Sequence, residues 1–264
     1  MRPLLDEPDM VGLLKEPVRA PKRNNALLEV VRGAERDRIF SELEWVPLKL
    51  GEVLCEAGQP FSHAYFPIDA IISILYVMHN AESAEIAIIG REGMIGVPLF
   101  MGGDSTSSRA IVQNAGFAYR LTAQQLKDEF ARGGMFQMIL LRFAQALITQ
   151  MVQTAACNRH HSLDQQLCRW LLMSLDRLKS SQLNMTQKLI GNMLGISGAG
   201  VKAAAAVLQK AGLIDYDKGN ITILDRAGIL RRSCECYGVV KAECERLFSA
   251  APNIAEARGV RVSS

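Results

Sequence analysis

The side chains with the clearest capacity to bind a partner lie mainly between residues 184 and 232, and they suit the binding of phosphate groups. This segment has seven basic side chains against three acidic ones, whereas the whole chain has a net charge of only +3. The seven are Lys188, Lys202, Lys210, Lys218, Arg226, Arg231 and Arg232. Because basic side chains that gather in one segment attract phosphates, this distribution favours a nucleic acid as the partner.

Residues 186–210 have the pattern of two short helices joined by a tight turn. Thr186 is a candidate N-cap for the first helix, and Gly195 can end that helix because glycine accepts a left-handed backbone. Ser197 is a candidate cap for a second helix over 198–210. Such a pair predicts a helix-turn-helix, whose second helix enters the major groove of DNA.

The residues after this helical pair predict a β-hairpin. Two short apolar runs, 213–216 and 221–224, flank the turn 217–220, whose sequence is Asp-Lys-Gly-Asn. A hairpin here makes the unit a winged helix-turn-helix and places Lys218 at its tip, where it can bind a phosphate. The alternative is a generic helical pair followed by a β-ribbon. The candidate DNA-binding residues are Thr186, Gln187, Lys188, Ser197, Gly198, Ala199, Lys202, Lys210 and Lys218.

The second helix has few side chains that could read base pairs. Apart from Lys202, positions 198–206 are all Gly, Ala or Val. A surface of alanine and glycine forms no bidentate hydrogen bond with a base edge, whereas lysine contacts phosphate. We therefore expect weak or shape-based readout of the DNA, helped by methyl contacts from Ala199 or Ala203 to thymine.

The cysteines and the paired histidines are interpreted as structural. Six cysteines in a chain without an export signal favour reduced thiols. His160 and His161 are adjacent, so their side chains diverge on a helix, and no cysteine or carboxylate stands at metal-ligand spacing. Cys234, Cys236 and Cys244 could form a thiol site, but the usual cluster spacings are absent. The sequence therefore predicts no metal and no cofactor.

Several classes of protein do not fit the sequence. It has no Gly-rich phosphate loop, no nucleophile elbow and no paired carboxylates with supporting histidines, so we expect no enzyme. Residues 1–23 carry four carboxylates among short apolar pairs, unlike a signal peptide. The most apolar run, 70–78, is far shorter than the ~20 residues that cross a bilayer. We expect a cytoplasmic protein with no membrane partner.

The rest of the chain must position these residues, and its pattern predicts an α+β fold. Residues 1–25 hold four of the nine prolines and predict a flexible tail. Over 26–132, short apolar runs separated by Gly and Pro predict a β sandwich or roll. The segments that follow are a long helix over 133–160, a connector helix over 161–183, the winged helix-turn-helix over 184–232 and a C-terminal extension over 233–264.

The long helix over 133–160 is apolar along two stripes. One stripe consists of Met138, Leu141, Gln145, Ile148, Val152 and Ala155. The other consists of Phe136, Leu140, Phe143, Leu147 and Met151. A helix with two apolar stripes needs two surfaces to pack against, and the first stripe has the spacing of a two-chain seam. We therefore expect a homodimer through the first stripe; the alternative is a helix buried inside its own domain.

The order of roll, long helix and C-terminal winged helix resembles that of the Crp/Fnr family of bacterial transcription regulators. TQKLIGNMLGIS, VLQKAGLI and GNITILDRAGIL resemble its helix-turn-helix and wing, and GREGMIGVPLFMGGDSTSSRAIVQNAG resembles its sensory roll. CNRHHSLDQQLCRWLLMSLDRL is similar to its connector, so the resemblance spans residues 43 to 230. It implies a cyclic-nucleotide-binding-like jelly roll and a dimeric regulator that binds double-stranded DNA. RNA polymerase is a further candidate partner, and the effector is unknown.

Two features of that family are missing here. Members that bind cyclic nucleotides hold the ribose with a Glu just after a Gly and the phosphate with an Arg-Ser pair further on. Here Val97 follows Gly96, and residues 104–107 include no arginine. A buried phosphate without a cation is costly, and Arg109 could reach it only with a shifted loop, so we expect no cyclic AMP binding. Iron-sulfur members carry cysteines ahead of the roll, whereas the first cysteine here is Cys55.

The second helix is bare, in the sense that it lacks side chains that could read base pairs, and this leaves one competing function open. In this alternative the regulator has weakened or lost its operator binding and acts through protein contacts, for instance in mixed dimers with a related chain. A titration of DNA binding against salt concentration distinguishes the two functions, because a dimer that contacts phosphates loses DNA affinity steeply as the salt concentration rises.

Overall fold

The computed structural model describes residues 25–80, 82–178, 182–217 and 219–249. The tail expected over 1–25 lies outside the described residues except for Asn25, and so do Lys218 and residues 250–264 of the extension. Asn25 is buried, and its side-chain amide donates to the backbone oxygens of Pro67 at 3.0 Å and Gly93 at 2.8 Å. The described chain is therefore attached to the roll from its first residue.

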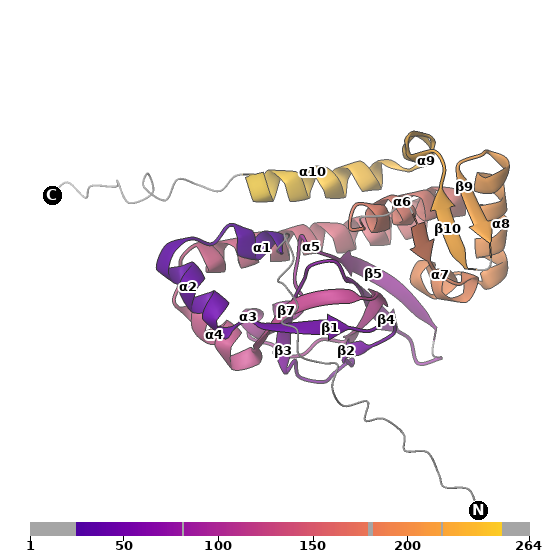
Figure 1. The fold of residues 1–264 in the computed structure, drawn as a ribbon. Coiled ribbons are helices and arrows are strands. Elements are labelled where there is room, and N and C mark those ends of the chain that lie inside the picture. The colour runs from indigo at the N-terminus through magenta and orange to yellow at the C-terminus, as the bar shows by residue number, and fades with distance from the viewer. Residues whose placement is uncertain (1–24, 81, 179–181, 218, 250–264) are drawn as a thin grey trace, which may run out of the picture.

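The first part of the chain forms the predicted roll from two antiparallel sheets (Figure 1). Its strands are β1 (Glu44–Leu48), β2 (Val53–Cys55), β3 (His63–Pro67), β4 (Ile71–Val77), β5 (Ser83–Ile89), β6 (Ser108–Asn114) and β7 (Gly116–Thr122). One sheet has the order β1-β7-β3 and the other the order β2-β6-β4-β5. In β4, Ile72 packs into the core of the roll while Ile71 and Leu75 face the C-terminal domain, which explains why both faces of this strand are mainly apolar.

Short helices flank the roll and lead into one long helix. They are α1 (Ala26–Glu29), α2 (Gly33–Glu42), α3 (Val97–Met101), α4 (Ala123–Ala131) and the long α5 (Met135–His160). Thr122 caps α4 as expected, because its hydroxyl accepts the backbone N–H of Gln125 at 3.2 Å. Gly134 precedes α5 with a positive φ of 93°, so the chain turns sharply before the long helix begins.

The two stripes of α5 lie in different environments. Phe136, Leu140, Phe143 and Leu147 are buried in the core of the roll. On the other stripe the large apolar residues are exposed to solvent: Leu141 by 51%, Ile148 by 55% and Val152 by 59%. By length and composition α5 is also apolar enough to cross a membrane, and 44% of its most apolar window is buried inside the protein. One stripe therefore packs against the roll, whereas the large apolar side chains of the other remain exposed.

The C-terminal domain contains the predicted helical pair and hairpin. Its elements are α6 (Leu163–Leu175), β8 (Gln182–Asn184), α7 (Gln187–Leu194), α8 (Gly198–Lys210), β9 (Ile214–Asp217), β10 (Asn220–Ile223) and α9 (Arg226–Arg232). The three strands form a small antiparallel sheet in the order β8-β10-β9. Leu171, Ile190, Leu208 and Ile221 are buried in its core, which holds the helices and the hairpin together.

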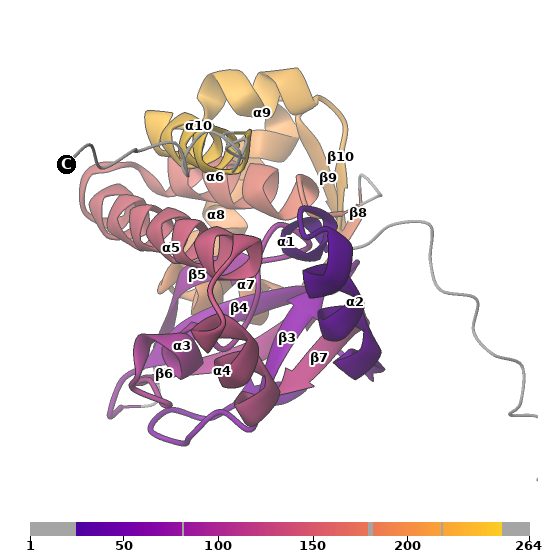
Figure 2. The same ribbon diagram turned by 90° about the vertical axis from the view of Figure 1, so that its left-hand side faces the viewer.

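A last helix, α10 (Glu235–Ser249), returns along the long helix. From the sequence we expect a C-terminal extension over 233–264, with no helix named there. Gln145 Nε2 donates to Glu243 at 3.2 Å, and Arg142 donates to the backbone oxygen of Leu247 at 3.3 Å. Figure 2 shows α10 above α5 and α6, on the side away from the roll. The chain's own C-terminal helix therefore covers one side of α5 and reaches the exposed stripe at Gln145.

The roll and the C-terminal domain meet around Glu85 on β5. This residue lies among β5, α5, α6 and α7, next to Gln150, Trp170 and Met193. It is 7% exposed, and one of its carboxylate oxygens has no hydrogen-bond partner among the described residues. Burial raises the pKa of the Glu85 carboxyl to about 7, although a hydrogen bond with Ser73 and the charges of nearby arginines oppose this.

We expect Glu85→Gln to change how stability depends on pH. Because the pKa of Glu85 is higher in the folded protein than the usual 4.5, the folded state binds the proton more tightly. Its contribution is complete below about pH 4.5 and is lost as the pH rises through about 7, a loss of roughly 3 kcal/mol. Urea unfolding at pH 5 and pH 8 should show this loss in the wild type but not in the variant. The exposed Glu82→Gln is the matched control and should behave like the wild type.

Candidate functional site

The helical pair α7 and α8 has the geometry of a helix-turn-helix. Thr186 Oγ1 accepts the N–H of Leu189 at 3.2 Å, and Ser197 Oγ accepts the N–H of Gly200 at 3.2 Å, so both expected caps are present. Gly195 ends α7 in the left-handed conformation with φ 66°. The two helices meet at 102°, within the range of roughly 90–120° that is usual for this motif.

Gly191, inside α7, allows the turn to pack closely. A Cβ placed on Gly191 would lie 2.7 Å from the backbone oxygen of Ile196. That oxygen belongs to the turn, and the N–H of Ile196 donates to the backbone oxygen of Gly191 at 2.9 Å. A side chain at position 191 would therefore push the turn away from α7.

The candidate DNA-binding residues lie on the exposed side of this unit. Val201, Ala204, Ala205 and Leu208 anchor α8 in the core. The exposed candidates are Thr186, Gln187 and Lys188 at the start of α7, and Ser197, Gly198, Ala199, Lys202 and Lys210 along α8. Over positions 198–206 the outward face of α8 is thus made of methyl groups and backbone, and Lys202 supplies the positive charge of that stretch.

The hairpin β9–β10 packs beside the start of α7. The N–H of Met185 donates to the backbone oxygen of Gly219 at 2.6 Å, and the Tyr216 hydroxyl donates to the backbone oxygen of Met185 at 3.2 Å. These bonds fix the hairpin as a wing next to the first exposed residues of α7. Lys218, expected at the tip, lies outside the described residues.

The arginines of this segment are partly neutralised by ion pairs. Arg226 is 2.6 Å from Asp176, and Arg232 is 2.9 Å from Asp164. Both aspartates precede residue 184, so counting charges over 184–232 does not include them. The positive charge that is free to meet phosphate therefore comes mainly from the lysines.

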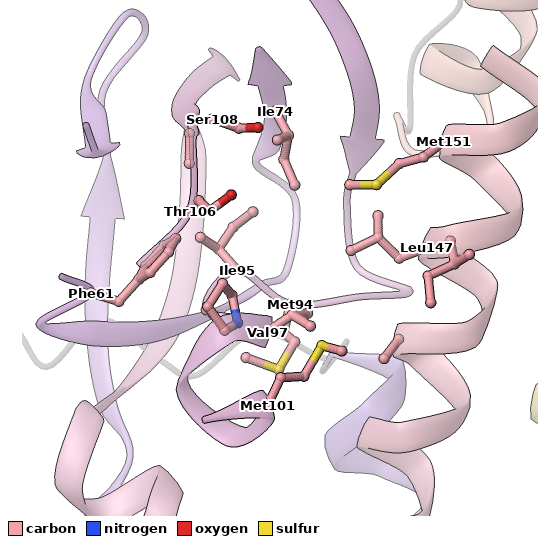
Figure 3. Close-up of a pocket in the computed structure, with 15 residues that line it drawn as sticks. Phe61, Ile74, Met94, Ile95, Val97, Met101, Thr106, Ser108, Leu147 and Met151 are labelled. Atoms are coloured by element: carbon pink, nitrogen blue, oxygen red, sulfur yellow. The ribbon is translucent and has the colours of Figure 1, made fainter. Parts of the chain in front are cut away.

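A small apolar cavity of about 170 Å³ lies between the roll and α5 (Figure 3). Val97 lines it, and the hydroxyls of Thr106 and Ser108 are its polar groups. None of the described residues that line the cavity carries a charge. Arg109, the nearest cation expected from the sequence, is instead paired with Glu56 at 2.8 Å. The cavity thus offers no cation to a phosphate.

Four sulfur and nitrogen ligands gather where α5 ends and α10 begins. The ligand atoms of Cys157, His161, Cys234 and Cys236 all lie within 4.8 Å of one another. The interpretation that no cysteine stands at metal-ligand spacing from the histidines is therefore wrong. Cys157 precedes His161 by one helical turn, a C-x3-H spacing that could have been noticed, but Cys234 is 77 residues away and only the fold brings it near.

Comparisons with known proteins agree with this arrangement. The chain matches the family model of a Crp-like helix-turn-helix domain over residues 165–232 and that of a cyclic nucleotide-binding domain over residues 45–132. The two matches together cover more than half of the chain. No curated protein sequence matches it.

Several solved structures share the fold at low sequence identity. FixK2 from Bradyrhizobium japonicum has a TM-score of 0.63 and 13% identity, over 73% of this chain and 98% of that chain. A transcriptional regulator of the CRP family from Thermus thermophilus has a TM-score of 0.60 and 15% identity, over 71% of this chain and 96% of that chain. The global regulator CLP from Xanthomonas campestris has a TM-score of 0.58 and 12% identity, over 72% of this chain and 98% of that chain.

Proposed function

The chain belongs to the Crp/Fnr family of transcription regulators, and we propose that it acts as a homodimer that binds DNA mainly through phosphate contacts and DNA shape. The observation that carries the proposal is the outward face of α8, where alanine, glycine and Lys202 stand at the positions that would meet base edges. Such a face can hold a protein on DNA through phosphate contacts, but it does not distinguish one base pair from another. Affinity then comes from Lys188, Lys202 and Lys210 of two chains.

The dimer is the second part of the proposal. Its support is the stripe of α5 formed by Met138, Leu141, Gln145, Ile148, Val152 and Ala155, in which Met138 is half-buried and the others are exposed. The other stripe is occupied by the roll, and α10 contacts this one at Gln145, so its exposed apolar side chains, Leu141, Ile148 and Val152, are the part that a second copy would cover. Two identical helices that meet along one stripe place two recognition helices on one face of the DNA.

The third part of the proposal concerns the roll, and we infer that the roll does not bind cyclic AMP. Its cavity is apolar, with Val97 in its wall and no charge among its described lining residues. Burying a cyclic phosphate there would cost free energy without a compensating cation. A small apolar effector fits the chemistry of the cavity better. As a regulator that binds DNA, the protein would act in the cytoplasm, with RNA polymerase as a further candidate partner.

A titration of DNA binding against salt tests the proposed DNA contacts. With three exposed lysines from each chain on about six phosphates, log Kobs should fall against log salt with a slope of about −5. Lys202→Gln should reduce that slope by about 2, one for each chain, and weaken binding to all sequences equally. Lys241→Gln, exposed on α10, is the matched control and should leave the slope unchanged.

The same gel shift compares the protein's own promoter with random duplex. We expect a specificity ratio below about 10³, and a larger ratio would reject weak readout by α8. Absence of DNA binding even at low salt would favour the second candidate function, a regulator that acts through protein contacts or mixed dimers. The bare face of α8 is the observation that supports this second candidate.

A further inference from the structure

We propose that Cys157, His161, Cys234 and Cys236 form a tetrahedral binding site for a thiophilic divalent cation, zinc above all, which fastens α10 to α5. Cys157 and His161 come from the end of α5, while Cys234 and Cys236 come from the start of α10. The three cysteines are buried together in a small cluster of their own, and His161 lies at its edge. We refer to these four residues as the Cys/His cluster.

The distances within the Cys/His cluster suit one metal ion. With zinc bonds of about 2.3 Å to sulfur and 2.0–2.1 Å to nitrogen, a tetrahedron has edges of about 3.8 Å between sulfurs and about 3.6 Å between sulfur and nitrogen. The Cys157 and Cys234 sulfurs are 3.5 Å apart, and the Cys236 sulfur is 3.6 Å from His161 Nδ1. A disulfide would need the sulfurs at about 2.05 Å. The four atoms already enclose the volume of a single ion.

His161 is oriented as a metal-binding histidine is. Its Nδ1 faces the cysteines, and its Nε2 lies 3.3 Å from a carboxylate oxygen of Glu235. If Nδ1 bears the metal, Nε2 carries the proton and donates it to Glu235. This carboxylate-histidine-metal arrangement fixes the tautomer and makes the imidazole a better ligand. The carboxylate is a second observation, independent of the four ligands.

The charge around the cluster also suits a metal thiolate. Three thiolates, one neutral imidazole and a dication have a net charge of −1. Arg169 is 7% exposed, acts electrostatically on both Cys157 and Cys236, and its Nε has no hydrogen-bond partner among the described residues. Glu85 is one acidic neighbour of this arginine, and a mono-anionic centre would supply a second counter-charge to it.

The ligand set indicates zinc in a structural role. Three sulfurs and one imidazole are soft ligands, and four protein ligands leave no open position for a substrate. Iron-sulfur clusters spread their ligands around several irons, whereas these four atoms lie within 4.8 Å of one another. The site joins two segments 77 residues apart, so the metal would hold α10 beside the exposed stripe of α5.

Metal analysis of the full-length protein tests the proposal. Protein purified under reducing conditions without chelator should contain about one zinc per chain by mass spectrometry of the elements. Cys236→Ser should lower the zinc content to less than about a tenth, because it removes one of four ligands. Cys244→Ser, also on α10 but outside the cluster, is the matched control and should keep its zinc.

Cobalt tests the geometry in the same protein. Co²⁺ added to metal-free wild type should give the intense visible bands of a tetrahedral ion and a thiolate charge-transfer band in the near ultraviolet. Glu235→Gln should keep these bands and weaken metal affinity about tenfold, as expected for a residue that orients a ligand. Glu245→Gln, exposed on the same helix, should not change the affinity.

Several results would overturn the proposal. They are a wild-type protein that is free of metal and gives no tetrahedral cobalt spectrum, iron with inorganic sulfide in place of zinc, and a Cys157–Cys234 disulfide with no metal. Equal loss of zinc in Cys244→Ser would overturn it too. If Cys236→Ser does not fold, the zinc content and the cobalt spectrum of the wild-type protein alone determine whether the cluster binds a metal ion.

Discussion

Leu141→Glu combined with Val152→Glu is expected to convert the protein to a monomer and to weaken DNA binding by about 10²–10⁴-fold. Both side chains are more than half exposed, and neither lines the cavity of the roll, so the fold and the cavity should be preserved. If the two α5 helices run parallel in the dimer, each glutamate would lie beside its own copy, which adds repulsion and buries unpaired charge. The loss of affinity follows because one half-site contact no longer holds the second near the DNA.

Light scattering coupled to size exclusion measures the mass of this double variant, and a gel shift measures its affinity. Leu50→Glu is the matched control, because Leu50 is 59% exposed on the roll, away from α5. It should remain dimeric and bind DNA like the wild type. A double variant that stays dimeric would show that the chains associate elsewhere.

Gly191→Val is expected to abolish measurable DNA binding while leaving the dimer intact. The new Cβ would meet a backbone oxygen of the turn at 2.7 Å, and backbone cannot move aside as the end of a flexible side chain can. Forcing the turn away from α7 should lower the free energy of unfolding by about 1–3 kcal/mol and tilt α8 relative to the wing. A gel shift and size-exclusion light scattering on the same sample separate the two effects.

Gly238→Val on α10 is the matched control for this substitution. Position 238 is helical and exposed, and a Cβ there meets no atom within 4 Å. The control should therefore keep its DNA binding and gain slightly in helix stability, by roughly 0.3 kcal/mol, because valine has a higher helix propensity than glycine. DNA binding by Gly191→Val at wild-type strength would mean that the turn can shift without displacing α8.

The parts of the fold that the sequence predicted are those set by local signals. Thr186, Gly195 and Ser197 lie within one short segment, and each acts through a backbone group a few residues away. The burial of one stripe of α5 follows in the same way from spacing along one helix. The Crp/Fnr fold followed from the order of these elements, and the family models confirm it.

The features that the sequence did not predict depend on residues far apart along the chain. Arg226 and Arg232 are counted as positive by the sequence, yet each meets an aspartate more than 45 residues away. The Cys/His cluster forms because α10 returns along α5, and no local pattern states where a terminal helix will dock. The same return determines which faces of α5 remain available to a partner.

The bare face of α8 also has a consequence for how this regulator could be retargeted. A Cβ at Gly198 meets no atom within 4 Å, and Ala199 and Ala203 are exposed, so longer side chains there would displace nothing in the chain. Arginine at one of these positions could form a bidentate contact with guanine, worth about 1–3 kcal/mol of discrimination. A single codon change could therefore give the helix a base preference without cost to its packing. New operator specificities can therefore evolve or be engineered on this helix by substituting its exposed small residues one at a time.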